Sequence, residues 1–162
     1  MKSPLITLLL AFALLTSVPA QAAQKAAPDF TLQGDNGPVV LSAHQGEVIY
    51  LDFWASWCGP CRESFPWMNS LQKKYGERGL KIIAVNLDKD RDNIRAFIEA
   101  TAPDFTIAYD PEGSIAEHYG VMGMPSSYLI DRNGKVHNSH IGFRSKDKAE
   151  LEKKIVQLLE SN

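Results

Sequence analysis

The sequence predicts an α/β domain in which a mixed central sheet carries helices on both faces. Three observations predict this class. In the middle of the chain, apolar strand-like runs alternate with segments of helical periodicity, which favours parallel strands joined by helices. Turn-forming residues at 34–38 and 131–134 separate strand-like flanks near the two ends, which favours antiparallel hairpins. The segment 147–160 has one apolar helical face and predicts a terminal helix.

The composition suits one soluble globular domain. The chain has 162 residues, of which 44% are hydrophobic and 22% charged, and its formal net charge is -2. These values are ordinary for a single domain. The small net charge provides no basic patch, so we expect no nucleic-acid partner.

The N-terminal segment has the parts of a secretory signal peptide. Lys2 is a basic start, Leu5 to Leu15 is an apolar run, and Ala20-Gln21-Ala22 fits a cleavage site between small residues. The run is shorter than the about 20 residues of a membrane-spanning helix. We therefore expect a signal peptide over 1–22 and a periplasmic domain over 23–162. An uncleaved segment would instead anchor the protein in the membrane.

The first strands lead to a buried central one. Ala27–Leu32 and Val39–Leu41 flank turn residues 34–38, which predicts a β-hairpin, and 42–46 follows as a loop or a short turn. Val48 to Phe53 is almost wholly apolar, which predicts a strand buried on both faces.

The next segment, Arg62 to Glu77, predicts a helix. Pro66 should kink it, and Gly76 and Gly79 should end it. Its apolar stripe consists of Phe65, Met68, Leu71 and Tyr75.

The remaining elements alternate along the chain. Predicted strands are 80–87, 105–109, 126–130 and 135–143. Predicted helices are 93–101, 114–119, with Ser114 as its cap, and 147–160, with Leu151, Ile155 and Leu158 on one face. The charged segment 88–92 is interpreted as a solvated connector.

Cys58 and Cys61 are the only cysteines, and they lie where the buried strand passes into the first helix. Unpaired N–H groups and the positive end of the helix dipole favour an anion at that position. The pKa of the Cys58 thiol should therefore fall and its reactivity rise. Cys61, one turn deeper, can attack a mixed disulfide on Cys58. A loop this short stabilises little through chain entropy, so the pair indicates chemistry rather than a structural staple.

A zinc site is the alternative interpretation of this spacing. Zinc needs four ligands, commonly a second pair of Cys or His. No further cysteine is present, and the histidines are scattered at His44, His118, His137 and His140. The pattern favours a redox pair and no metal.

Asp52 interrupts the apolar strand. A carboxylate in a buried strand is costly unless it is paired or protonated. Either its side chain points out at the strand end, or it is a buried acid beneath Cys61 with a pKa raised by desolvation. In the second case it could accept the proton of Cys61.

The run Leu51–Cys61 resembles the active-site run of thioredoxins. Residues 27–32, 88–105 and 120–126 are similar to the TlpA/ResA-like branch, which comprises exported thiol-disulfide oxidoreductases. The resemblance covers essentially the whole chain after residue 22. It implies a thioredoxin fold with an N-terminal hairpin and an inserted helix.

The resemblance also implies roles for individual residues. Cys58 would attack, Cys61 would resolve, Asp52 would be the buried acid, and Pro125 would be a cis-proline facing the disulfide. A cis peptide there would leave the backbone of Met124 free to pair with an extended substrate. The substrate surface would comprise Met124 with Trp57, Gly59 and Pro60; core packing is the alternative for Trp57.

Three departures from related sequences concern the surroundings of Asp52. Ser64 stands where the TlpA/ResA-like branch often has Glu, and Asp52 stands where that branch often has Asn. Ala84 stands where thioredoxins often have Lys. We therefore expect Asp52 to lack a cationic partner and to titrate high.

The sequence thus predicts a periplasmic thiol-disulfide oxidoreductase that reduces protein disulfides with its own cysteine pair and no added cofactor. Gly59-Pro60 is the dipeptide of reducing thioredoxins. A reductant in an oxidising compartment needs electrons from outside, so a membrane-embedded reductase is the expected partner of a monomeric enzyme. An oxidase or isomerase of folding proteins and a copper chaperone are the alternatives. Peroxidase activity is disfavoured because Ala55 stands where peroxiredoxins need Thr.

Overall fold

The computed structural model describes residues 24–161, so the predicted signal peptide lies outside the described residues. Seven strands form one mixed sheet in the order β2-β1-β5-β4-β3-β6-β7. The strands are β1 Thr31–Gly34, β2 Gly37–Val40, β3 Val48–Trp54, β4 Leu80–Asn86, β5 Thr106–Tyr109, β6 Ser126–Ile130 and β7 Val136–Ile141. The helices are α1 Gly59–Tyr75, α2 Arg91–Thr101, α3 Ser114–Tyr119 and α4 Lys148–Glu160, with short 3-10 turns η1 Leu41–His44, η2 Gly76–Arg78 and η3 Ser145–Asp147.

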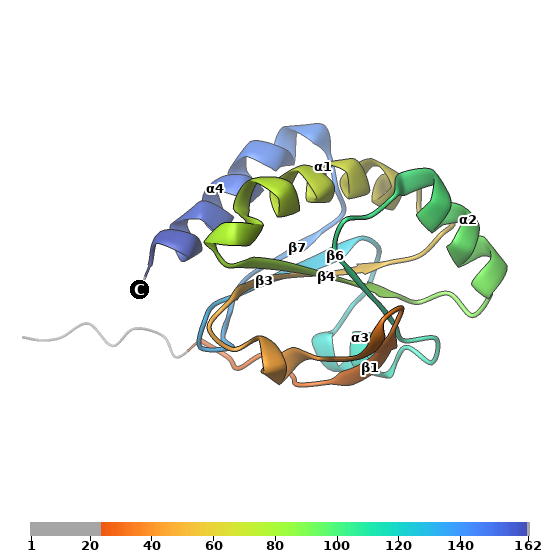
Figure 1. Ribbon diagram of the computed structural model, residues 1–162, viewed down its shortest axis with the longest axis horizontal. Helices are drawn as coiled ribbons and strands as arrows, with labels where there is room; N and C mark the ends of the chain where they lie inside the picture. The colour runs from red at the N-terminus through yellow and green to blue at the C-terminus, as the bar shows by residue number, and fades with distance from the viewer. Residues whose placement is uncertain (1–23, 162) are drawn as a thin grey trace, which may run out of the picture.

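Helices cover both faces of the sheet, as predicted (Figure 1). Helices α1, α2 and α4 lie together on one side, here called the α1 face, whereas α3 lies on the other side, the α3 face (Figure 1). β3, β4 and β5 are parallel, β6 is antiparallel to β3, and β7 is antiparallel to β6. The thioredoxin-type arrangement with an N-terminal hairpin and an inserted helix, α2, is therefore confirmed.

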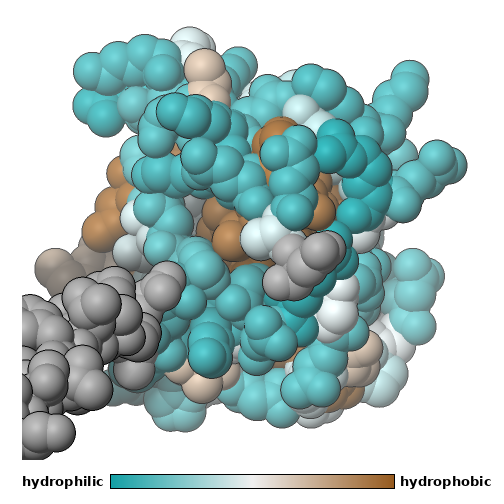
Figure 2. Space-filling view, turned by 90° about the vertical axis from the view of Figure 1, so that its left-hand side faces the viewer, coloured by the Kyte–Doolittle hydropathy of each residue, from teal (hydrophilic) through white to brown (hydrophobic). Residues whose placement is uncertain are grey.

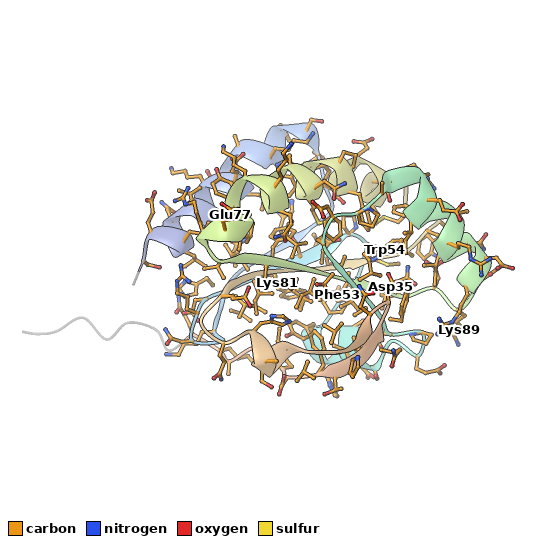
Figure 3. The ribbon with its side chains drawn as sticks, viewed as in Figure 1. Asp35, Phe53, Trp54, Glu77, Lys81 and Lys89 are labelled. Atoms are coloured by element: carbon orange, nitrogen blue, oxygen red, sulfur yellow. A yellow bond between two sulfur atoms is a disulfide. The ribbon has the colours of Figure 1, made fainter. Side chains whose placement is uncertain are left out.

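The central strand β3 is buried along its whole length. Alternate side chains point to opposite faces of a strand. Tyr50 and Trp54 accordingly belong to the core on the α1 face, and Leu51 and Phe53 to the core on the α3 face. Figure 3 shows Trp54 and Phe53 on opposite sides of the strand. Asp52 shares the parity of Tyr50 and Trp54, so its side chain is on the α1 face.

Helix α1 begins earlier than predicted, at Gly59 rather than Arg62. Cys58 is the N-cap, and Pro60 occupies the first turn. Proline fits there because its fixed φ is already helical and its missing N–H would have no partner within the helix. The cysteine pair is therefore part of the helix end, not of a preceding loop. Helix α2 also begins earlier than predicted, at Arg91, because the Asp90 carboxylate accepts a hydrogen bond from the N–H of Asp92 at 2.9 Å.

One prediction about the later helices was wrong in detail. Ser114 does not cap α3. The buried carboxylate of Asp110 instead accepts hydrogen bonds from the N–H groups of Ser114, Ile115 and Ala116 at 3.1, 2.9 and 3.0 Å. In α4, Leu151 and Ile155 are buried as predicted together with Leu159, and the predicted Leu158 is partly buried against the same core. Within 24–161, none of the helices has the length and apolarity to cross a membrane.

Candidate active site

Cys58 and Cys61 form a disulfide at the N-terminus of α1, with their Cα atoms 5.3 Å apart. The Cys58 Sγ accepts a hydrogen bond from the backbone N–H of Cys61 at 3.2 Å. Cys61 is fully enclosed, whereas Cys58 retains a small exposed area. A thiolate at Cys58 would therefore meet a backbone N–H and the helix dipole, both of which stabilise negative charge.

Asp52 is the buried acid of this region. Its side chain is 1% exposed, and its Oδ2 has no hydrogen-bond partner among the described residues. Burial raises the pKa of the Asp52 carboxyl well above its ordinary value. Ala84 lies opposite Asp52 on β4, and no lysine or arginine of 24–161 pairs with it. The predicted burial of Asp52 is confirmed, and an outward-pointing side chain is excluded.

Tyr50 and Ser127 share the surroundings of Asp52. Tyr50 lies two residues earlier on the same face of β3, and Ser127 on β6 is the direct cross-strand neighbour of Asp52. Burial, followed by the charge of Asp52, raises the pKa of the Tyr50 hydroxyl. Tyr50 therefore stays protonated and adds no charge to the site.

The peptide bond Met124–Pro125 is cis, as predicted from the resemblance. Pro125 immediately precedes β6, whose first residue Ser126 pairs with Phe53 near the end of β3. Met124 packs against the core cluster that contains both cysteines. Among the described residues, the backbone N–H and C=O of Met124 have no hydrogen-bond partner. They are available for a strand-like contact with another chain.

Exposed apolar side chains gather around the disulfide. Trp57, Met122 and Ile141, here called the apolar rim, are 73%, 90% and 64% exposed. Trp57 precedes Cys58, Met122 lies in the cis-proline loop, and Ile141 pairs with Ser126 at the start of β6. The alternative interpretation, that Trp57 packs in the core, is therefore wrong. Gly59 and Pro60 are exposed beside Trp57, whereas Trp54 is fully buried.

The opposite end of the molecule differs from the apolar rim. Figure 2 shows the end at which α4 finishes, and outside the grey region hydrophilic residues dominate this face. Hydrophobic residues show there only in small areas between them. Large exposed apolar side chains thus mark the disulfide end, and such patches on monomeric proteins indicate interaction sites.

Asp88 is a site residue that the sequence analysis missed. It was interpreted as part of a solvated connector, but its side chain is buried and hydrogen-bonded. Its carboxylate accepts hydrogen bonds from the Ser56 N–H at 2.7 Å, the Ser56 hydroxyl at 2.9 Å and the Asn86 amide at 2.8 Å. The active-site loop is thereby fastened to the end of β4. The sequence offered one signal for Asp88. It directly follows the predicted strand 80–87, and the cysteine pair follows the predicted strand 48–53. The carboxyl ends of neighbouring parallel strands meet at one edge of a sheet.

Arg62 supports the same loop from α1. Its guanidinium donates a hydrogen bond to the carbonyl of Ser56 at 3.3 Å and stacks over the Phe97 ring at 4.7 Å. Nowhere in 24–161 do three or more His, Cys, Asp or Glu side chains form a group that could hold a metal ion.

Comparison with known proteins identifies the family. The family model described as Redoxin matches residues 21–155. The chain belongs to the redoxin family. It is 36% identical over 127 residues to the thiol-disulfide oxidoreductase ResA of Bacillus thuringiensis, covering 78% of this chain and 73% of the relative. It is 37% identical over 133 residues to the thioredoxin-like protein YneN of Bacillus subtilis, covering 80% and 76%.

A solved structure of high similarity supports the same assignment. A crystal structure assigned as thiol:disulfide interchange protein DsbE from Chlorobium tepidum matches with a TM-score of 0.82 and 53% identity, covering 84% of this chain and 96% of that one. The resemblance to the TlpA/ResA-like branch and the predicted fold are confirmed. This redoxin-family chain is a thiol-disulfide oxidoreductase, and the close Cys58–Cys61 pair is the feature suited to that chemistry.

Proposed function

We propose that this redoxin-family enzyme reduces disulfides of protein substrates outside the cytoplasm. The observation that carries the proposal is the Cys58–Cys61 pair at the N-terminus of α1, with the buried acid Asp52 on the strand below. This arrangement supports the proposal that Cys58 attacks, Cys61 resolves and Asp52 accepts a proton.

The proposed reaction begins at Cys58. Its thiolate attacks one sulfur of the substrate disulfide, forms a mixed disulfide and expels the first substrate thiolate. Cys61 then transfers its proton to Asp52 and attacks the Cys58 Sγ. The second substrate thiolate leaves, and the Cys58–Cys61 disulfide remains. Two electrons have passed from the dithiol of the enzyme to the substrate.

The surface around the disulfide supports a protein substrate. The free backbone groups of Met124 beside cis-Pro125 would pair with an extended segment. Trp57, with Gly59 and Pro60, would contact apolar side chains next to the target disulfide. Exposed aromatic groups of this kind contribute strongly to protein interfaces.

The proposed compartment and electron supply follow from the sequence. A signal peptide over 1–22 would export the domain to the periplasm, where the disulfide left after each turnover must be reduced again. A membrane-embedded reductase would supply these electrons to a monomeric enzyme. Gly59-Pro60, which resembles the dipeptide of reducing thioredoxins, supports this direction.

The reduction potential of the Cys58–Cys61 pair tests the direction. The mature domain is equilibrated with glutathione buffers of known ratio, and the dithiol fraction is determined by thiol alkylation. We expect a potential near that of thioredoxin, about −270 mV. A value near about −120 mV, as in strong oxidases, would contradict the reductase proposal and favour an oxidase or isomerase of folding proteins.

A further inference from the structure

Three polar side chains form a row across the sheet on the α1 face. Asp52 on β3 is the direct partner of Ser127 on β6, and Ser127 is the direct partner of His140 on β7. Both strand pairs are antiparallel. Residues opposite each other in such pairs have Cβ atoms about 4.5–5.5 Å apart and share a face. Within 24–161 the structure shows no direct hydrogen bond from the Asp52 Oδ2 or the His140 Nε2, but this spacing leaves the polar ends close enough for hydrogen bonds through one water.

The row lies on the α1 face, where Cys61 also lies. Leu129, two residues after Ser127, belongs to the same core cluster as Cys61. At the other end of the row, the His140 Nε2 lies 3.6 Å from the Oδ2 of Asp147, immediately before α4. The row thus starts at Asp52, on the face of the sheet that also carries Cys61, and ends near the junction of η3 and α4.

Burial decreases along the row. Asp52 is 1% exposed, Ser127 is 5% exposed, and the side chain of His140 is 25% exposed. Among the described residues, the Asp52 Oδ2 and the His140 Nε2 are both buried atoms without a hydrogen-bond partner. Unpaired polar atoms are rare in protein interiors and call for an explanation. Here they stand at the two ends of one row, with a hydroxyl between them.

We propose that Ser127 and His140 carry to solvent the proton that Asp52 receives from Cys61. This proposal rests on the proposed role of Asp52 as the base for Cys61. The protonated Asp52 passes its proton to the Ser127 hydroxyl oxygen, while the proton of that hydroxyl moves to the imidazole of His140, directly or through a bridging water. The imidazolium then releases a proton to water from its other ring nitrogen. Asp52 and Ser127 return to their starting protonation states, and His140 is left neutral in its other tautomer, which proton exchange with water resets before the next turnover. No electrons move along the row.

The surroundings of His140 suit this step. Imidazole accepts and releases protons near neutral pH. The Asp147 carboxylate stabilises the imidazolium, and its own pKa is lowered first by its hydrogen bond with Arg144, whose Nε lies 2.8 Å from the Asp147 Oδ2. Other titratable groups on this face are Tyr50 on β3, Cys61 on α1, Lys146 in η3 and Lys154 on α4. Lys154 donates a hydrogen bond of 3.0 Å to the Asn138 side chain.

Single-turnover kinetics with a model disulfide test the proposal. Rapid quenching follows the mixed disulfide on Cys58 across pH 5 to 9 in Ser127→Ala, His140→Gln and Asp52→Asn variants of the full domain. His137→Gln is the matched control, because His137 lies on the same strand but outside the row, at the irregularity in the β6–β7 pairing, and its Nε2 lies 2.8 Å from the Asp131 Oδ2.

We expect Ser127→Ala and His140→Gln to slow resolution about tenfold near neutral pH, a fraction of the effect of losing the base itself. The first attack by Cys58 should stay within about twofold of wild type, because the helix N-terminus is unchanged. Added imidazole should accelerate His140→Ala, and Ser127→Thr, which retains a hydroxyl, should resolve at nearly the wild-type rate. His137→Gln should behave as wild type.

Three outcomes would overturn the proposal. If Asp52→Asn slows resolution while Ser127→Ala and His140→Gln match the His137→Gln control, the relay is wrong and the role of Asp52 stands. If Asp52→Asn also resolves at the wild-type rate, the proposed base fails together with the relay. If Ser127→Ala and His140→Gln slow the first attack as much as resolution and unfold at lower denaturant, both residues are structural.

Discussion

At the scale of single residues, Asp52 is an acid held in a dry site without a cation. Its Oδ2 has no partner in 24–161, and burial alone accounts for the raised pKa of its carboxyl. A group of this kind is suited to take the proton of a thiol, because burial raises its proton affinity above that of an ordinary carboxylate. The same burial should also be measurable as a cost to stability.

Asp52→Asn should separate the two chemical steps. The first attack by Cys58 should remain nearly intact, because the helix N-terminus supports that thiolate. Resolution by Cys61 should slow about ten- to a thousandfold, since the thiol loses its proton acceptor. Rapid-quench trapping of the mixed disulfide measures both steps, and exposed Asp92→Asn is the control. Equal resolution rates in Asp52→Asn and wild type would show that the proton leaves Cys61 by another route.

Asp52→Asn should also stabilise the oxidised protein in a pH-dependent way. The pKa of this carboxyl is raised in the folded state, so the folded protein binds the proton more tightly than the unfolded chain does. Burial of Asp52 therefore costs the wild type least stability at a pH below 3.8, the ordinary pKa of the carboxyl. The wild type loses stability as the pH rises from there through the folded pKa. At pH 7 the free energy of unfolding of the variant should exceed that of the wild type by about 1.4 kcal/mol for each unit by which folding raises the pKa of Asp52. The difference should vanish near pH 3, where Asp52 is protonated in both states. Urea melts at each pH test this; a constant difference would contradict it.

Trp57 is the residue whose exposure separates binding from folding. Its side chain is 73% exposed, so Trp57→Ala should change the free energy of unfolding by less than about 0.5 kcal/mol. Loss of its apolar contact should lower kcat/KM for a protein disulfide about tenfold, equivalent to about 1.4 kcal/mol. Reduction of a small aromatic disulfide is the control reaction and should change little. Equal losses for both substrates would place the effect at Cys58 rather than at the rim.

At the scale of elements, the active-site loop between β3 and α1 is held by the end of β4. Ser56, two residues before Cys58, gives both its N–H and its hydroxyl to the Asp88 carboxylate. The Asn86 side chain binds the same carboxylate. The position of the cysteines therefore depends on a neighbouring strand and not only on their own helix.

Asp88→Ala should destabilise the enzyme and reduce its activity together. The change leaves the Ser56 N–H and the Asn86 amide without their partner, which should cost about 1–3 kcal/mol in the free energy of unfolding. A less fixed loop should also slow the first attack by Cys58. Asp92→Ala is the control, because the Asp92 side chain is 86% exposed and its pair with Arg95 is 3.6 Å long, so a change within about 0.5 kcal/mol is expected. Denaturant melts and single-turnover rates measure both effects, and wild-type behaviour of Asp88→Ala would show that the loop holds itself.

At the scale of the whole molecule, redox state and folding are linked through one pair of sulfurs. If the folded dithiol is a stronger reductant than the same pair in the unfolded chain, the oxidised fold must be the more stable form. We expect the oxidised domain to unfold at a higher denaturant concentration than the reduced domain. Its free energy of unfolding should be larger by about 1.4 kcal/mol for each 30 mV between the reduction potentials of the folded and unfolded chain. A reduced form that is the more stable would be the behaviour of an oxidase.

The sequence by itself determined most of the fold and the centre of the site. The apolar run of β3, the alternation of strands and helices, and the Asn133-Gly134 turn all follow from local periodicity and turn chemistry, which act over a few residues. Cys58, Cys61 and the buried Asp52 could be found for the same reason, because strand, cysteine pair and helix are consecutive.

Only the tertiary structure decided what surrounds these residues. From the sequence, Asp88 is interpreted as a solvated charge. Asp88 is 32 residues from Ser56 along the chain, and only packing brings the two within hydrogen-bond distance. The alignment of Asp52 with Ser127 and His140 depends on strand register, which changes the face of every side chain when it shifts by one residue. Register and burial are set by long-range packing, which no local pattern in the chain contains.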